Sequence, residues 1–299
     1  MRLCTLILCC SLCASAQAQG DIRFESTEVA PGIHMLQGVG GFAGGNLGLL
    51  TGDDGAILID DGMLPLFDKT YAAIGKQVGG KVDFVVNTHA HGDHVGGNKG
   101  LSEAGATIIA HDRLRQRLVE EGVTGPDGQM PATAHWLPEI TFNDAVTLHL
   151  NGQRVHVFHV ANAHTDGDSI VHFPDADVIH AGDVLFNGLF PYIDLDSGGS
   201  VDGYVAAQRK IIALAGDDTK IISGHGPLAT RKDVQAANDM LVDSCERVKK
   251  LLDAGHSADE ILKMNPLADY DADWSWGFIT TERLTRTLVR DLQRGHAKD

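Results

Sequence analysis

The chain has 299 residues, of which 43% are hydrophobic and 21% are charged, a composition typical of a folded globular protein and not of a disordered or collagen-like chain. Lys and Arg number 24 against 40 Asp and Glu, so the formal net charge is −16. A chain this acidic offers no overall basic field to a phosphate backbone or an anionic lipid surface. Its charge therefore argues against a general nucleic-acid binder and against a stable membrane partner.

Residues 1–18 have the pattern of a secretory signal peptide. One arginine precedes an apolar run that ends at about Cys13, and alternate alanines up to Ala18 supply the small residues of a cleavage site. The run is too short to cross a bilayer as a helix. The mature protein is therefore expected to be secreted, with the periplasm as its compartment. A lipoprotein is the alternative, although Ser11 and Leu12 fit poorly as the residues before a lipidated cysteine.

Four of the five cysteines lie in this predicted signal, so only Cys245 remains in the mature chain. Oxidising compartments favour disulfides, but a single cysteine cannot form one within the chain. Cys245 recurs at helical spacing with Leu241 and Val248, which predicts a packed small residue rather than a reactive thiol. The hydrophobic core must therefore stabilise the fold by itself.

The rest of the chain alternates apolar strand-like runs with helical patterns. Strands are predicted at 32–37, 47–51, 56–60, 82–87, 107–110, 145–150, 154–160, 169–173, 178–180 and 220–222. Helices are predicted at 66–78, 112–121, 201–214, 230–254, 257–264 and 280–293. Glycines and three prolines make residues 122–138 a predicted loop. Strands and helices that interleave in both halves favour an α/β fold in which helices cover sheet layers.

The segment from His89 to His94, with the sequence HAHGDH, directly follows the predicted strand 82–87. Three imidazoles and one carboxylate in so short a segment match the ligand preferences of zinc. Residues two apart point the same way in an extended turn, so His89 and His91 can share one metal while Asp93 and His94 reach a second. The alternative is a polar surface turn, which rarely concentrates histidine in this way. The segment therefore predicts a metal site at the carboxyl end of a strand.

At these residues the chain resembles the metallo-β-lactamase-fold superfamily. The resemblance extends over nearly the whole mature chain, because later segments match further family motifs in the expected order, each after a predicted strand: Asn162–Asp168, His180–Asp183 and Ser223–Pro227. It implies an α/β (α+β) fold, namely an αββα sandwich of two mixed β-sheets flanked by helices. It also implies a single domain over residues 19–299 with a C-terminal helical extension from about residue 230.

The resemblance also implies which residues hold metal. One Zn²⁺ would take His89, His91 and His164, a second would take Asp93, His94 and His225, and Asp183 would bridge them. In such a centre a hydroxide between the two ions attacks a substrate carbonyl, and Asp93 orients water or relays a proton. Other divalent metals, such as iron or manganese, suit the same ligands.

Three residues beside these ligands are candidates for outer contacts that orient the imidazoles. Asp60 ends the predicted strand 56–60 and matches the family's outer aspartate, although an ordinary turn residue beside Asp61 is an equal alternative. Thr88 and Thr165 each adjoin a ligand histidine.

Aromatic residues near the motifs are candidates for the walls of a substrate pocket, because small-ligand sites are mostly apolar. They are Phe42, Trp136, Phe186, Phe190 and Tyr192, each of which could equally be ordinary core. Asn187 is a candidate donor to a developing oxyanion. Trp274 and Trp276 are candidates to cap the pocket from the C-terminal region.

Asp183 stands where one large subclass of true β-lactamases has cysteine, so the chain is more similar to the glyoxalase-II-like, lactonase and general hydrolase branches. Predicted export argues against a cytosolic glutathione thioester as the natural substrate. The expected function is a zinc-dependent hydrolase of a small acyl compound, which is a β-lactam, lactone, ester or thioester. One alternative is a single-iron oxidoreductase similar to the persulfide dioxygenases, which the full second ligand set argues against. The other is a zinc-binding relay protein without turnover.

Overall fold

The structure of the protein is a computed structural model that describes residues 21–125 and 128–296. The predicted signal peptide, residues 1–18, lies outside the described residues. Within the described part, no helix combines the length and the apolar composition that a membrane span requires.

The first sheet has seven strands in the spatial order β1-β2-β3-β4-β5-β6-β9. Their bounds are Arg23–Ala30, Ile33–Val39, Leu47–Gly52, Gly55–Ile59, Phe84–Val86, Thr107–His111 and Ile140–Phe142. The first four strands pair antiparallel, and the last four pair parallel, with β4 common to both groups. The sheet is therefore mixed, and the carboxyl ends of β4, β5, β6 and β9 lie at one edge.

The second sheet has five strands in the order β10-β11-β12-β13-β14. Their bounds are Ala145–Leu150, Gln153–His159, Ser169–Phe173, Val178–His180 and Lys220–Ile222. The first four pair antiparallel in a meander, and β13 pairs with β14 parallel. This sheet is mixed as well.

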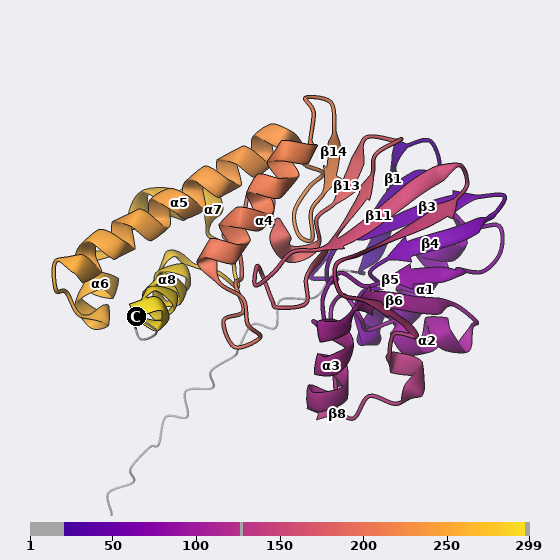
Figure 1. Ribbon diagram of the computed structural model, residues 1–299, viewed down its shortest axis with the longest axis horizontal. Coiled ribbons are helices and arrows are strands. Elements are labelled where there is room, and N and C mark those ends of the chain that lie inside the picture. Colours follow the sequence, from indigo (N-terminus) through magenta and orange to yellow (C-terminus); the bar gives the residue numbers. More distant parts are fainter. Residues whose placement is uncertain (1–20, 126–127, 297–299) are drawn as a thin grey trace, which may run out of the picture.

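The two sheets pack face to face, and Figure 1 shows the strands of the second sheet between helix α4 and the strands of the first sheet. Their shared core joins Ile57 and Val86 of the first sheet to Val157 and Val171 of the second. All four side chains are fully buried. This apolar layer fixes the relative position of the two sheets and thus of the loops at their edges.

Helices cover both outer faces. Helices α1 (Phe67–Gly75) and α2 (Asn98–Glu103) cover the first sheet through Ile74 and Leu101, and α3 (Asp112–Glu121) follows β6. Helices α4 (Val201–Leu214) and α5 (Arg231–Asp253) lie on the second sheet, as Figure 1 shows. The predicted sandwich of two mixed sheets between helices is confirmed.

The C-terminal helices build a separate cluster of buried side chains against α4 and α5. They are α6 (Ala258–Met264), α7 (Asp271–Trp274) and α8 (Thr281–His296), and α8 contributes the buried Leu284 and Leu288. Cys245 packs against the same cluster, and burial raises the pKa of its thiol to about 11. The thiol is therefore a packing group, as its helical spacing predicts.

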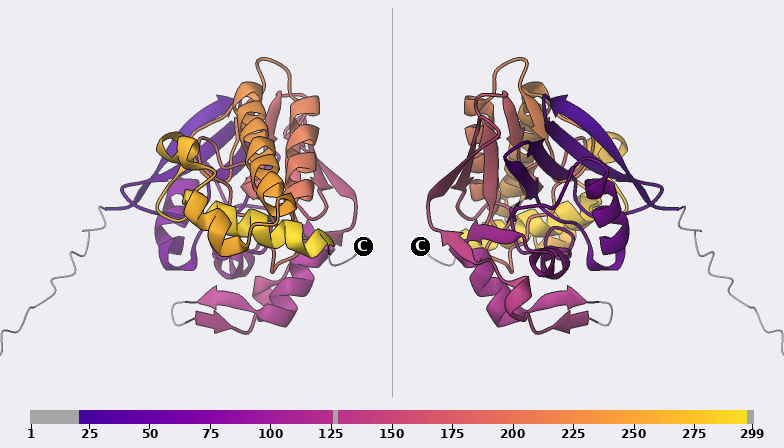
Figure 2. Two further views of the ribbon diagram at one scale, coloured as in Figure 1. Left: turned by 90° about the vertical axis from the view of Figure 1, so that its left-hand side faces the viewer. Right: turned by 90° about the vertical axis from the view of Figure 1, so that its right-hand side faces the viewer.

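The sequence-based prediction missed several short elements. β1 is largely exposed and polar, so it lacks the apolar pattern of a strand. β9 and α2 are too short to show a period, and η1 (Leu64–Leu66), η2 (Ala134–Trp136), η3 (Gly182–Val184) and η4 (Ala268–Tyr270) are single 3₁₀ turns. The predicted loop 122–138 contains the hairpin β7 (Val123–Gly125) and β8 (Gly128–Met130), which projects from the body in Figure 2.

Candidate metal centre

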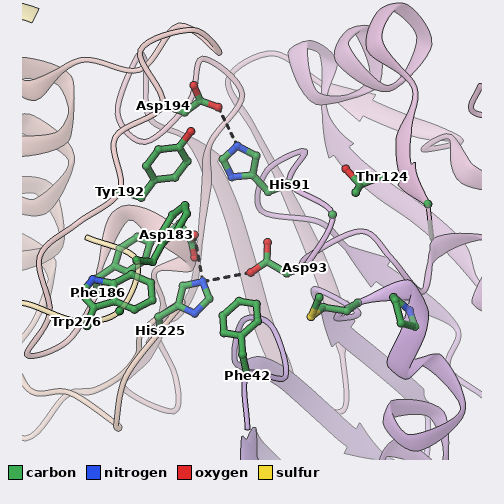
Figure 3. A pocket seen from close by; sticks show the side chains of 16 residues that line it. Phe42, His91, Asp93, Thr124, Asp183, Phe186, Tyr192, Asp194, His225 and Trp276 are labelled. Carbon is green, nitrogen blue, oxygen red and sulfur yellow. Dashed lines mark hydrogen bonds and ion pairs between the residues drawn. The ribbon is translucent and has the colours of Figure 1, made fainter. Parts of the chain in front are cut away.

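Seven metal-ligand side chains meet where the two sheets present their strand ends. His89, His91, Asp93 and His94 lie in the turns between β5 and α2. The other three come from the second sheet: His164 follows β11, Asp183 lies in η3 after β13, and His225 follows β14. Loops at strand ends place these residues together although they are distant in the sequence. Four of them face one cavity in Figure 3.

The first donor group consists of His89, His91, His164 and Asp183, whose ligand atoms all lie within 4.8 Å of one another. Nδ1 of His91 is 3.1 Å from Nε2 of His89 and 2.8 Å from Nε2 of His164. Oδ2 of Asp183 lies 3.6 Å from Nε2 of His164. The three ring nitrogens and one carboxylate oxygen thus converge on one point.

The second donor group consists of Asp93, His94 and His225, again within 4.8 Å. Nε2 of His225 lies 3.4 Å from Oδ2 of Asp93 and 3.4 Å from Oδ2 of Asp183. Nε2 of His94 lies 3.1 Å from Oδ1 of Asp183. Asp183 therefore stands between the two groups, within reach of both.

Two atoms of this cluster favour a cation. In the described part of the chain, His94 Nε2 and Asp183 Oδ1 are buried and make no hydrogen bond. A buried polar atom without a partner is costly, and a metal ion would satisfy both atoms at once. Imidazole and carboxylate donors in sets of three or four are what zinc prefers. The residues present therefore fit one or two divalent metal ions.

Asp60 orients His94 from behind. Its Oδ2 lies 2.7 Å from Nδ1 of His94, so it holds the ring with Nε2 toward the centre. Thr88 donates its backbone N–H and its hydroxyl to the two oxygens of Asp60, and its Oγ1 is 3.1 Å from Nδ1 of His89. Asp60 adopts a positive φ of 57° directly after β4, which turns its carboxylate inward. Asp60 thus contacts the ring of His94 directly, and Thr88 contacts both Asp60 and the ring of His89.

A second carboxylate, Asp194, is absent from the sequence-based prediction. Its Oδ2 lies 3.0 Å from Nε2 of His91, and its Oδ1 accepts from the backbone N–H groups of Asp196 and Ser197. Burial opposes its ionisation, but these hydrogen bonds and that of His91 lower its pKa. Asp194 follows no strand and belongs to no ligand motif, so only its place after Tyr192 could have drawn attention to it.

Thr165 acts on the loop and not on an imidazole. It gives both its N–H and its hydroxyl to Asp168, whose pKa is raised to about 7 by burial. The His164 ring is oriented instead by the backbone carbonyl of Tyr192, 2.7 Å from its Nδ1.

The pKa values divide the histidines into two classes. Burial lowers the pKa of His89 well below its usual range and lowers that of His164 to about 4. Burial acts in the same direction on His94 and His225, but adjacent carboxylates, above all Asp183, outweigh it. The pKa of His94 is therefore raised well above its usual range, and that of His225 is raised to about 9. His89 and His164 are therefore neutral at pH 7, whereas His94 and His225 hold protons that a cation would displace.

A cavity of about 930 Å³ opens above the cluster. Its walls are Phe42, Met63, Pro65, His91, Gly92, Asp93, Thr124, Gly125, Asp183, Phe186, Tyr192, Asp194, His225, Trp276, Gly277 and Phe278. Figure 3 shows the aromatic side chains gathered beside His225 and Asp183. The cavity is large enough for a small molecule placed directly over the donor groups.

Three of the predicted pocket residues line this cavity and three do not. Phe42, Phe186 and Tyr192 are wall residues, and so is Trp276. Trp136 is buried with α3 and β7, and Phe190 is buried in the C-terminal cluster.

Asn187 also lies elsewhere. Its amide donates to the backbone carbonyls of Pro227 and Leu228, so its N–H groups serve the loop around His225 and not an oxyanion. Met63, Pro65, Thr124 and Phe278 line the cavity without having been predicted, because they come from segments with no ligand motif.

Comparison with known proteins bears on this centre. A family model described as the metallo-beta-lactamase superfamily matches residues 40–225, a range that contains all seven donors. A hydroxyacylglutathione hydrolase from Pelagibacter ubique is 27% identical over 175 residues, covering 57% of this chain and 62% of that protein. The alpha subunit of 2,4-dinitroanisole O-demethylase from Nocardioides sp. is 23% identical over 189 residues, covering 62% of this chain and 54% of that protein. The chain thus spans roughly half to two thirds of the length of these relatives.

Among solved structures, a metallo-beta-lactamase from Pontibacter korlensis superposes with a TM-score of 0.59 at 18% identity. The match covers 73% of this chain and 99% of that one. At this identity the likeness concerns the fold alone. Trp276 and Phe278, which line the cavity, lie beyond the segment that the family model matches.

Proposed function

Since the chain belongs to the metallo-beta-lactamase superfamily, we propose that it is a zinc-dependent hydrolase of a small acyl compound, such as a lactone, ester, thioester or β-lactam. The observation that carries the proposal is the position of Asp183. Its carboxylate lies between two complete donor groups at the floor of an open cavity, and one of its oxygens is buried without a hydrogen bond.

The donor set would hold two metal ions, one on His89, His91 and His164, the other on Asp93, His94 and His225, with Asp183 common to both. When bound there, such ions supply Lewis acidity and lower the pKa of a water molecule. The orientation of the rings is a property of the chain itself. Asp60 and Asp194 each engage the outer nitrogen of an imidazole, which leaves the inner nitrogen facing the centre.

Asp93 is the proposed catalytic carboxylate. It borders the cavity, and its Oδ2 lies 3.4 Å from Nε2 of His225. Burial opposes its ionisation, but His94 and His225 hold its pKa at about 2. Asp93 is therefore a carboxylate at neutral pH and can accept a hydrogen bond from a water molecule in the cavity, which orients that water toward a carbonyl carbon.

Hydrolysis of such a substrate forms a bond from the water oxygen to the carbonyl carbon and breaks the bond to the leaving oxygen, sulfur or nitrogen. One water proton ends on the leaving atom. In this proposal the apolar walls of the cavity would hold the acyl part of the substrate, with its carbonyl over the donor groups. The export predicted from residues 1–18 makes an extracytoplasmic substrate part of this proposal.

The test combines metal analysis with a hydrolysis panel. The protein is purified without chelators, loaded with zinc and offered a chromogenic cephalosporin, acyl lactones, aryl esters and thioesters. We expect about two zinc equivalents and turnover of at least one class. Asp183→Asn should lower turnover by more than about 100-fold, whereas His149→Ala, an exposed histidine of β10, should match the parent.

Circular dichroism of Asp183→Asn would separate a lost centre from a lost fold. A protein that binds zinc and leaves every acyl compound intact would be a binding or relay protein instead. One iron equivalent with oxygen uptake on a persulfide substrate would indicate the oxidoreductase alternative. Either result overturns the proposal.

A further inference from the structure

We propose that the cavity selects an uncharged ester, open or cyclic, whose acyl part is an alkyl or aromatic group, and that it rejects anionic substrates. The inference rests on the proposed hydrolase function and specifies the substrate class of that same site. It is carried by the aromatic walls and by the charges that line the cavity.

The aromatic side chains form one connected wall that leads outward from a donor histidine. The Phe186 ring stacks on His225 with centroids 4.9 Å apart, and the Trp276 ring lies 6.0 Å from Phe186. Phe278 follows at 5.6 Å from Trp276, and Tyr192 closes the wall at 5.3 Å from Phe278. A flat or branched apolar group attached to a carbonyl over the donors would lie against this wall.

Other apolar side chains line the cavity as well. Met63 and Pro65 belong to the lining, and the Phe42 ring stacks on His225 with centroids 6.0 Å apart. Phe42 is 54% exposed and Phe278 is 44% exposed, which is unusual for large apolar side chains. Exposed apolar side chains at the mouth of a cavity are removed from water when they contact an apolar ligand, and this favours the binding of such a ligand.

The charged groups of the lining repel anions. Apart from the donor residues, the charged side chain in the lining is Asp194, a carboxylate. Among the described residues that line the cavity there is no lysine and no arginine. A carboxylate at the far end of an acyl group, held away from the metal ions that the donors would bind, would therefore lose its water without gaining a cationic side chain, and the outer acid Asp194 would repel it.

The nearest candidate cation at the rim is already engaged. The Arg283 guanidinium carbon lies 3.8 Å from the Phe278 ring centroid and 5.4 Å from that of Tyr192. Its Nη1 donates to the backbone carbonyl of Phe278 at 3.0 Å. Arg283 thus stabilises the aromatic wall, because its hydrogen bond and its cation–π contacts are all made with residues of that wall.

The test uses two esters that differ in one terminal group. 4-Nitrophenyl hexanoate and the 4-nitrophenyl monoester of adipic acid share a leaving group and an acyl length, and a carboxylate replaces the terminal methyl in the second. On the zinc-loaded protein we expect kcat/KM to be at least about 100-fold higher for the neutral ester. Equal values, or a preference for the anionic ester, would overturn the inference and leave the hydrolase proposal standing.

Substitutions in the wall test the same point from the protein side. Trp276→Ala and Phe278→Ala should each raise KM for the neutral ester by about 10-fold with little change in kcat, because they remove binding and not chemistry. Tyr71→Ala, an exposed aromatic residue of α1 outside the lining, is the matched control. Arg283→Gln should leave the preference for the neutral ester in place. A selective loss of anionic turnover in this variant would mean that Arg283 binds the carboxylate, and the inference would be wrong.

A binding measurement separates this inference from the hydrolase proposal. The neutral dye N-phenyl-1-naphthylamine should brighten on binding to the cavity, and N-phenylhexanamide should displace it while the anilide of adipic acid does not. If no compound of the hydrolysis panel, these two esters included, is hydrolysed but this displacement pattern holds, the hydrolase function fails and the apolar selectivity stands. If both amides displace the dye equally, the selectivity fails whatever the activity.

Discussion

Asp194 and His91 meet at 3.0 Å between a carboxylate oxygen and the ring nitrogen that faces away from the donor cluster. Asp60 makes the corresponding contact with His94 at 2.7 Å. Each donor group therefore has its own carboxylate behind one of its imidazoles. Such outer carboxylates fix the ring orientation and raise the basicity of the inner nitrogen.

Asp194→Asn should weaken zinc binding to the group of His91 by about 10-fold to 100-fold, because the imidazole loses its charged partner. Competition with a chromogenic chelator measures the affinity. Asp196→Asn, an exposed acid two residues away that pairs with Arg290, is the control. An unchanged zinc affinity in Asp194→Asn would show that the His91 ring is fixed by its other neighbours.

Gly224→Ala should abolish tight metal binding through a steric effect on Asp183. A Cβ atom at Gly224 would overlap Oδ1 of Asp183 and the backbone of Gly182, so the carboxylate would have to leave its place between the two donor groups. Metal content by mass spectrometry should fall below one equivalent. Gly79→Ala, where a Cβ meets no atom within 4 Å, should retain the parent content.

Zinc binding to the two donor groups should depend differently on pH. The His225 pKa is raised to about 9 and that of His94 is raised as well, so both must lose a proton when a cation binds. Affinity of their group should therefore increase as the pH rises toward 9. The His164 pKa is lowered to about 4 and that of His89 is also lowered, so these two imidazoles have no proton to lose in this range.

Calorimetric titration with zinc between pH 6 and 9, in buffers of different ionisation enthalpy, measures both affinity and proton release. We expect one site, that of His94 and His225, to strengthen more steeply with pH and to release more protons than the other. Two sites with the same pH dependence would contradict the assignment of the pKa shifts to the two groups.

Removal of metal should destabilise the whole fold, because the donors come from both sheets. A ligand present at 100 times its Kd adds about 2.7 kcal/mol to the free energy of unfolding, which for a chain of this size corresponds to about 4 °C in Tm. Differential scanning calorimetry before and after chelation, and after zinc is restored, checks this. Asp183→Asn should show a much smaller shift with the chelator.

Four of the seven donor residues could be proposed from the residues themselves, because they occur within one short segment that follows an apolar strand. His164, Asp183 and His225 were assigned through the resemblance to the family, whose motifs recur in the expected order after predicted strands. Asp60 was a candidate because it ends a predicted strand and matches the family's outer aspartate, with an ordinary turn residue as the equal alternative.

The cavity walls could not be predicted in the same way, because a pocket depends on tertiary packing. Phe186 and Phe190 are four residues apart, yet Phe186 faces the cavity and Phe190 is fully buried among the C-terminal helices. Nothing in their local pattern separates them. Asp194 and Phe278 were missed for the same reason, since each reaches the centre through a loop whose path is set by distant contacts.

All seven donors lie between residues 89 and 225, whereas Trp276 and Phe278 belong to the turn that precedes α8. The donor residues and these two cavity walls thus belong to separate stretches of the sequence. Substitutions in this turn can alter the shape of the cavity without changing any donor residue. Related proteins that keep the same histidines therefore need not accept the same substrates. Transfer of this turn to a related protein would test whether the turn carries a substrate preference.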